Sequence, residues 1–204
     1  MEKFSSLTSS GEMPFLRLVD PRVSFDFLGG MFLSVFRRQK WEECQGVLDA
    51  EAIIDPRIFS HFDNTFPHVK IFASAFSGSK AYFNANPFSV CLTGAREWAP
   101  MYPLVRSVRM VEALEEYRKN GLPFLRYLRC RNFALSNFLP DVVRMLVRPE
   151  QSGRRYVSLV KLMLRNMLYP NFYLSPFIPL IRKWRVRRAA VNQNTAMQNQ
   201  NPQP

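Results

Sequence analysis

The sequence has few of the side chains that carry out chemistry in enzymes. His61 and His68 are the only two histidines, and the three cysteines stand far apart without a Cys-x-x-Cys pair. A zinc site needs three or four ligands at closer spacing, and a disulfide framework needs paired cysteines. Neither phosphate-binding glycine motif, G-x-G-x-x-G or G-x-x-x-x-G-K-[ST], occurs. The sequence therefore predicts a non-enzymatic protein without a metal or other cofactor, and the lone cysteines favour a reducing compartment.

Long apolar runs are also absent. No stretch reaches the roughly 18 apolar residues that predict a transmembrane helix. The amino terminus has no apolar signal core, and Glu2 and Glu12 are unusual in a mitochondrial presequence. The hydrophobic content of 47% is nevertheless that of a globular protein, and 204 residues are enough for one good core.

Acidic residues are scarce in the second half of the chain. Residues 1–100 carry ten Lys or Arg and eleven Asp or Glu, whereas residues 101–204 carry eighteen and five. The net charge of +12 thus comes from the second half, and no acidic residue follows Glu150. This asymmetry points to a polyanionic partner, either nucleic acid or an anionic membrane surface. A soluble protein that is merely basic is the alternative.

A pair of short helices is predicted near the amino terminus. Apolar residues recur at steps of three and four over residues 23–36, and again over residues 40–52. Arg37, Arg38 and Lys40 fall where cations meet the negative end of the first helix. Asp55-Pro56 would end the second helix, because the residue before proline avoids helical backbone angles. Neither helix can bury its apolar face alone, so the pair needs neighbours.

This segment resembles one pentatricopeptide repeat. The resemblance rests on Val23-Ser24-Phe25-Asp26, Arg38-Gln39-Lys40-Trp41-Glu42-Glu43-Cys44, Leu48 and Asp55-Pro56, with a second echo over residues 111–123, VEALEEYRKNGLP. Pro56 and Pro123 are 67 positions apart, close to two repeats of about 35 residues. The resemblance covers about 50 residues and implies stacked helical hairpins, an RNA partner and an organelle, but it does not place base-reading positions. An ordinary helical hairpin with a chance match is the alternative.

Further helices are predicted along the rest of the chain. We expect them over residues 68–76, 104–120, 140–148 and 153–169, the last with a basic side and one apolar stripe. Gly121 and Pro123 should end the second of these. Prolines should keep residues 170–179 extended. The Asn- and Gln-rich residues 191–204 should be disordered unless a partner orders them.

The candidate binding residues are basic, with one aromatic among them. They are Arg126, Arg129, Arg131, Arg154, Arg155, Lys161, Arg165, Arg182, Lys183, Trp184, Arg185, Arg187 and Arg188. Arginine makes bidentate contacts with phosphate and stacks on bases, and Trp184 could stack on an unpaired base. The same residues would suit an acidic lipid surface.

Together these features predict a mostly α-helical protein of stacked, repeat-like helical hairpins with a basic, partly extended carboxyl-terminal arm. We expect an extended or frayed lead-in over residues 1–19 and a helical domain over residues 20–169. The arm follows over residues 170–190 and the tail over residues 191–204. The first functional hypothesis is a structural, RNA-binding subunit of a large ribonucleoprotein, with a mitochondrial ribosome in the matrix as the best guess. The alternative is a peripheral, matrix-side subunit of an inner-membrane complex such as ATP synthase.

Overall fold

The protein is mostly α-helical, as the sequence predicts, with helices stacked on one another and a single small sheet among the described residues. The computed structural model describes residues 6–23, 34–86, 97–181, 184 and 188. Its first part contains β1 (Gly11–Pro14), α1 (Phe15–Leu18), α2 (Arg38–Glu43), η2 (Gln45–Val47), α3 (Ala50–Ile54), α4 (Phe62–Thr65), α5 (Pro67–Phe76) and β2 (Lys80–Phe83). Its second part contains η3 (Ala99–Met101), α6 (Tyr102–Leu104), η4 (Val105–Arg109), α7 (Met110–Lys119), α8 (Phe124–Ala134), η5 (Leu135–Asn137), α9 (Phe138–Val147), η6 (Arg154–Tyr156), α10 (Leu159–Asn166) and α11 (Pro170–Leu174).

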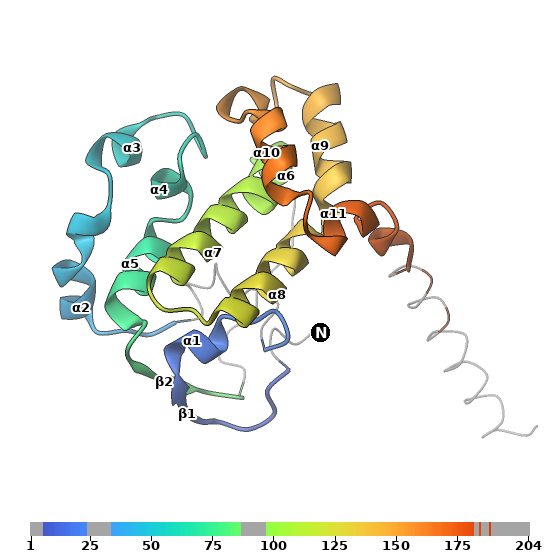
Figure 1. Ribbon diagram of the computed structural model, residues 1–204. Coiled ribbons are helices and arrows are strands. Elements are labelled where there is room, and N and C mark those ends of the chain that lie inside the picture. The colour runs from blue at the N-terminus through green and yellow to red at the C-terminus, as the bar shows by residue number, and fades with distance from the viewer. Residues whose placement is uncertain (1–5, 24–33, 87–96, 182–183, 185–187, 189–204) are drawn as a thin grey trace, which may run out of the picture.

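Helix α7 is the centre of the core. It continues directly from α6 and η4, so the helical run predicted over residues 104–120 is confirmed. Val111, Leu114 and Tyr117 follow one another at three-residue steps and are all buried. Helix α5 packs on one side of α7 and α8 on the other (Figure 1). The burial of this helix from both sides is what fixes the arrangement of its neighbours.

A tight turn reverses the chain between α7 and α8. Gly121 has a φ of +102°, which a residue with a side chain adopts only with strain. The amide of Leu122 donates to the carbonyl of Tyr117 at 2.9 Å, and that of Gly121 donates to Arg118 at 3.3 Å. These two bonds form a Schellman cap, so the predicted cap at Gly121 is confirmed. The result is an antiparallel α7–α8 hairpin.

The remaining helices close the second half of the molecule. Helix α9 packs against α6, and α11 packs against α8, η5 and α9. The buried carboxylate of Asp141 on α9 accepts from Arg106 Nε at 3.0 Å and from Ser107 Oγ at 2.7 Å, both on η4. A polar contact inside the core therefore fixes α9 against the central helical run.

The amino-terminal lead-in is folded rather than frayed over the residues described there. β1 pairs antiparallel with β2, from Gly11 opposite Phe83 to Pro14 opposite Lys80. The ring of Phe15 then lies 6.0 to 6.4 Å from the rings of Phe72, Phe76 and Tyr117. The expectation of an extended or frayed lead-in therefore holds only for the extended residues of β1, because strand pairing and aromatic packing fold the segment onto the body.

Neither of the two helices predicted over residues 23–52 is found as predicted in the described residues. Residues 24–33 lie outside the described ranges, and residues 34–36 are not helical. The second helix is wrong as predicted, because the chain forms α2, η2 and α3 in its place. Leu48 is extended, and the Asp49 carboxylate caps α3 by accepting from the amides of Glu51 and Ala52. A strong helix start at Asp49 thus interrupts the apolar periodicity.

Two predictions near the carboxyl end also need correction. Residues 153–169 do not form one helix, because Val157 and Ser158 are extended between η6 and α10. Pro170 does not leave the following stretch extended, because it occupies the first turn of α11, where proline needs no amide donor. Residues 178–181 are helical as well and lead away from the body (Figure 1).

We predict that Leu114→Ala lowers the free energy of unfolding by about 2–5 kcal/mol, because it leaves a cavity in the core. Leu114 is fully buried on α7, whereas Leu146 on α9 is 59% exposed. Leu146→Ala is therefore the matched control and should change stability by less than about 0.5 kcal/mol. Urea unfolding followed by circular dichroism measures both. Equal losses in the two variants would contradict the assignment of α7 to the core.

Candidate functional site

The predicted binding residues separate into an internal group and an exposed group. Arg126 and Arg129 on α8 belong mainly to the internal group. Arg129 Nη1 lies 3.2 Å from Asp20 Oδ2, and Arg126 Nη1 donates to the carbonyl of Leu16 at 2.8 Å. Both side chains are partly exposed, but their polar ends secure the amino-terminal segment to α8.

Asp20 is the receiving carboxylate in this contact. It is buried, and it also accepts from the Arg22 backbone amide at 2.9 Å and from the Arg22 side chain. Burial alone would raise the pKa of Asp20. The hydrogen bonds from Arg22, with the charges of Arg22 and Arg129, outweigh burial and lower that pKa below its ordinary value. Two of the predicted phosphate ligands are thus already engaged with the first half of the chain, Arg129 with the Asp20 carboxylate and Arg126 with the Leu16 carbonyl.

Arg131 is buried and serves the core. Its Nη1 lies 3.1 Å from Glu115 Oε1 on α7, and its Nη2 lies 3.2 Å from Asn166 Oδ1 on α10. The guanidinium carbon stands 4.9 Å from the centre of the Tyr169 ring. Arg165 pairs with the same Glu115 from the exposed side. Arg131 is therefore a structural residue and not a surface ligand, contrary to the prediction, and the charge of Arg165 is shared with that pair.

The other predicted residues of the body are at the surface. Arg154 Nη1 donates to the Val157 carbonyl at 2.7 Å, which leaves it only partly exposed. Arg155 is exposed and lies over the ring of Tyr156, 4.9 Å from its centre. Lys161 on α10 is exposed. These three remain candidates for a negatively charged partner.

The arm is described at two of its predicted residues. Trp184 is 58% exposed, and the guanidinium of Arg188 lies over its ring at 5.0 Å. This cation–π pair shows that a basic and an aromatic side chain share one side of the arm. Arg182, Lys183, Arg185 and Arg187 lie outside the described residues.

Two exposed cations were missed by the sequence reasoning. Arg144 and Arg148 lie on and just after α9, and within the described ranges neither takes part in a side-chain hydrogen bond or ion pair. The four-residue step between them is the signal that could have found them.

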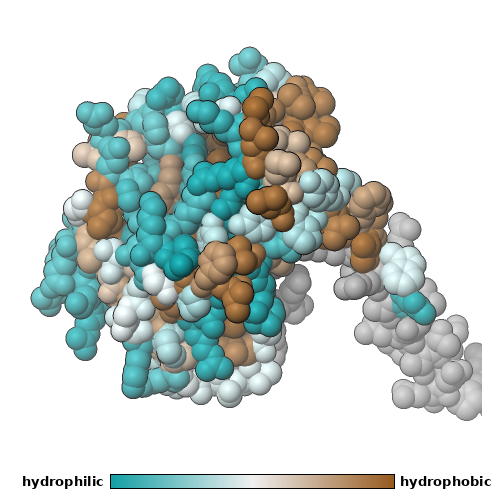
Figure 2. All heavy atoms as spheres, in the orientation of Figure 1, coloured by the Kyte–Doolittle hydropathy of each residue, from teal (hydrophilic) through white to brown (hydrophobic). Residues whose placement is uncertain are grey.

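Large apolar side chains accompany these cations at the surface. In the part of the chain that the structure describes, most of the exposed ones lie beyond residue 142. On α9 and α10 they are Val143, Leu146, Val147, Val160 and Leu164. Figure 2 shows brown, hydrophobic surface over the region of α9 and α10. The predicted single apolar stripe over residues 153–169 is therefore divided. Leu159 is buried, Tyr156 and Met163 pack partly buried against the core, and the exposed members are Val160, Leu164, Met167 and Leu168.

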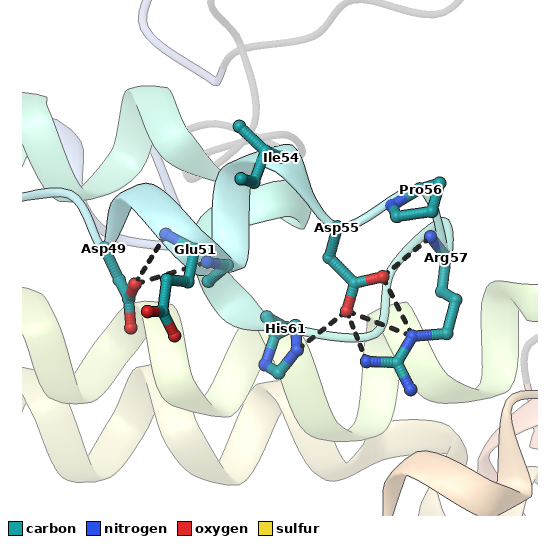
Figure 3. A pocket seen from close by; sticks show the side chains of 8 residues that line it. Asp49, Glu51, Ile54, Asp55, Pro56, Arg57 and His61 are labelled. Atoms are coloured by element: carbon teal, nitrogen blue, oxygen red, sulfur yellow. Dashed lines mark hydrogen bonds and ion pairs between the residues drawn. The ribbon is translucent and has the colours of Figure 1, made fainter.

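A shallow hollow lies elsewhere, beside α3, and contains Asp55, Arg57 and His61 (Figure 3). Asp55 Oδ2 is 3.0 Å from His61 Nε2 and also 3.0 Å from Ser60 Oγ. The serine hydroxyl therefore bonds to the carboxylate and not to the imidazole. A nucleophilic serine needs a hydrogen bond to the imidazole, which takes its proton, so this arrangement does not activate Ser60. Hydrogen bonds from Arg57 to Asp55 lower the pKa of that carboxyl. The hydrogen bonds of Asp55 with Arg57, Ser60 and His61 hold the loop after α3 in place.

Neither a metal cluster nor a membrane-spanning helix is found within the described ranges. No three His, Cys, Asp or Glu side chains gather there in a way that could hold a metal ion. No helix there combines the length and the apolar character needed to cross a bilayer.

No family model, curated protein or solved structure matches the chain.

We predict that Arg131→Ala destabilises the fold by about 1–3 kcal/mol, because it leaves the buried side-chain oxygen of Asn166 without its donor and leaves the half-buried Glu115 with Arg165 alone. Arg155→Ala is the matched control at an exposed arginine and should change stability by less than about 0.5 kcal/mol. Thermal and urea unfolding measure both. A stable Arg131→Ala protein with weakened polyanion binding would contradict the structural role.

We also predict that Asp20 makes stability depend on acidity. Since its pKa is lowered in the folded state, Asp20 stabilises the protein above its unfolded-state pKa of about 4. That contribution is lost as the pH falls through the lower, folded-state pKa. The stability difference between wild type and Asp20→Asn should therefore be largest near pH 6 and shrink towards pH 2. Urea midpoints across this range test it, and a difference independent of pH would refute it.

Proposed function

We propose that this protein is a non-enzymatic subunit of a large ribonucleoprotein. Its helical body docks on protein neighbours, and its basic carboxyl-terminal arm contacts RNA. The observation that carries this proposal is the division of the cations. Arg109, Arg129 and Arg131 are engaged within the body, whereas Arg155, Lys161 and Arg188 are exposed toward the carboxyl end.

The division supports the proposal because only exposed cations can meet phosphate without dismantling the core. Arg109 shows the internal role clearly, since it is buried, donates to the Phe59 carbonyl at 3.1 Å and pairs with Glu112 at 2.7 Å. The arm has no acidic residue to compete for its own cations. Its positive charge is therefore left for a polyanion.

The pairing of Trp184 with Arg188 favours unpaired RNA bases over a simple phosphate surface. An exposed indole ring stacks on a base, and a guanidinium beside it reaches the neighbouring phosphate. Contacts of this kind give affinity with little sequence specificity. The arm would follow an RNA strand and not read it.

The mitochondrial ribosome is the most specific form of this proposal. It is supported by the resemblance of residues 23–56 and 111–123 to pentatricopeptide repeats, which implies RNA and an organelle. Helix α7 and its glycine cap lie where the second segment would have its helix and closing turn, whereas residues 40–52 of the first segment form α2, η2 and α3 in place of one helix. The matrix location rests on the same resemblance.

A peripheral, matrix-side subunit of an inner-membrane complex is the second candidate. Exposed apolar side chains recur one helical turn apart in the arm, beside its basic residues. They are Phe177, Leu180, Ile181 and Trp184, which stand at relative positions 0, 3, 4 and 7. An amphipathic, basic segment with tryptophan is the kind that lies on acidic lipid headgroups. In this case the arm would contact lipid in place of RNA.

We predict salt-steep binding of the purified protein to single-stranded RNA. The slope of log affinity against log salt should be negative and should shrink by roughly 0.7 for each cation–phosphate contact that is removed. Replacing Arg182, Lys183, Arg185, Arg187 and Arg188 by Gln should therefore weaken binding and flatten the slope. The control replaces the exposed residues Arg38 and Lys80 of the body by Gln and should do neither.

Cardiolipin-containing vesicles, tested across the same salt series, separate the two candidates. If the protein binds vesicles through the arm and does not bind RNA, the membrane-complex candidate is favoured over the ribonucleoprotein. If RNA binding is unchanged after the arm cations are replaced, the proposal that the arm binds RNA is refuted.

A further inference from the structure

The exposed faces of α9 and α10 share a sequence pattern. Residues 143–148 read VRMLVR, and residues 160–165 read VKLMLR. Each has an apolar residue at positions one and five and a cation at positions two and six. The third position is buried in both, as Met145 and as Leu162. The same small motif thus occurs twice, once on each helix.

Helical geometry turns this pattern into a two-part surface. Positions one and five lie on the same face one turn apart, and positions two and six lie about 100° further around the helix. Each motif therefore presents an apolar row with a row of cations along one side. The other side of the apolar row is flanked by the fourth position, which is the exposed Leu146 on α9 and the half-buried Met163 on α10. The buried third position lies beyond the row of cations and packs into the body.

The apolar rows are well exposed. Val143 and Val147 on α9 have 56% and 72% of their surface exposed, and Val160 and Leu164 on α10 have 69% and 63%. Figure 2 shows apolar surface gathered over both helices. Large apolar side chains that gather on the surface of a folded protein in this way mark an interaction site, because an isolated monomer gains nothing from exposing them.

The cationic rows are available for pairing. Within the described ranges, Arg144, Arg148 and Lys161 make no side-chain hydrogen bond or ion pair, and Arg165 shares Glu115 with Arg131. No acidic residue follows Lys161 and Arg165, and near the α9 cations Asp141 is buried against Arg106 while Glu150 forms no ion pair within the described ranges. The charges complementary to these rows must come from elsewhere.

The arrangement favours a protein helix over the other possible occupants. A second copy would set cation rows against cation rows, which like-charge repulsion opposes. RNA presents phosphates, sugars and base edges, and it offers no aliphatic surface against which rows of valine and leucine could pack. A bilayer surface does not require cations at a fixed spacing. Cations one helical turn apart do match carboxylates one turn apart on a facing helix.

From this geometry we propose that α9 and α10 form a docking face for an acidic amphipathic helix of a neighbouring protein. The partner lays its own apolar row against Val143, Val147, Val160 or Leu164 and sets a row of Glu or Asp against Arg144, Arg148 and Lys161. The proposal rests on the proposed function in one respect, since it identifies the kind of neighbour on which the helical body docks.

The test uses two designed peptides of about 18 residues, long enough to form a helix. Both carry one leucine row, flanked by Glu in the first peptide and by Lys in the second. The full-length protein should bind the Glu peptide roughly ten times more tightly than the Lys peptide at low salt. Leu164→Gln should weaken binding of the Glu peptide roughly tenfold, and Arg148→Glu with Lys161→Glu should reverse the preference. All these side chains are exposed, so the variants should keep the wild-type melting temperature.

Matched controls lie on other elements. Leu125 on α8 is 75% exposed, so Leu125→Gln removes an apolar side chain of the same size outside the face. Lys80→Glu reverses a cation on β2. Neither should change peptide binding.

Three results would overturn the docking proposal. The first is equal binding of the two peptides or no binding of the Glu peptide. The second is loss of vesicle binding in Leu164→Gln, which would mean that the face binds lipid. The third is loss of RNA binding in the same variant, which would mean that the face binds RNA. Failure of this proposal remains distinguishable from failure of the RNA function. RNA binding depends on the arm cations and should survive Leu164→Gln, and Glu-peptide binding depends on α9 and α10 and should survive the Gln replacements in the arm.

Discussion

The packing of three helices depends on a guanidinium that lies inside the protein. The side chain of Arg131 is only 7% exposed, and a buried charge is tolerated only where opposite charge and hydrogen-bond acceptors surround it. Glu115 on α7 supplies the charge, Asn166 on α10 supplies an acceptor, and the ring of Tyr169 covers the guanidinium. The requirement to satisfy this one group holds α7, α8 and α10 in a single arrangement.

The same requirement recurs at two buried carboxylates, and together they explain which charges remain outside. Asp141 joins α9 to Arg106 and Ser107 on η4, and Asp20 joins the amino-terminal segment to Arg129 on α8. Each contact uses an arginine from the middle of the chain and a carboxylate distant in sequence. In the second half of the chain, which has five acidic residues, Glu115 and Asp141 are engaged in these internal contacts, so several of the later cations have no carboxylate partner within the described ranges. The proposed RNA arm and the proposed docking face are two consequences of this one distribution.

The sequence predicted the elements whose signals are local. The three-residue steps of Val111, Leu114 and Tyr117 defined α7, and Gly121 defined its end, because the helix face and the cap depend on near neighbours alone. The region around Asp49 failed, because a single helix start there overrides a periodic apolar pattern. The folding of residues 11–18 depends on a strand partner nearly 70 positions away, which no local pattern indicates.

The candidate site was predictable in kind but not in detail. Composition showed a basic second half, yet it could not separate Arg131, whose partner Glu115 is sixteen residues earlier, from Arg155 at the surface. The amphipathic pattern of α10 was also clear. It could not decide orientation, because Leu162 and Leu164 are equally apolar and only the packing of neighbouring helices buries the first and exposes the second.

Arginine-selective labelling with phenylglyoxal, read residue by residue by mass spectrometry, tests the division of the cations most directly. In the folded protein Arg109 and Arg131 should react far more slowly than Arg144, Arg148 and Arg155, and unfolding in urea should abolish the difference. Rapid labelling of Arg109 and Arg131 in the native protein, at the rate of the surface arginines, would contradict the account.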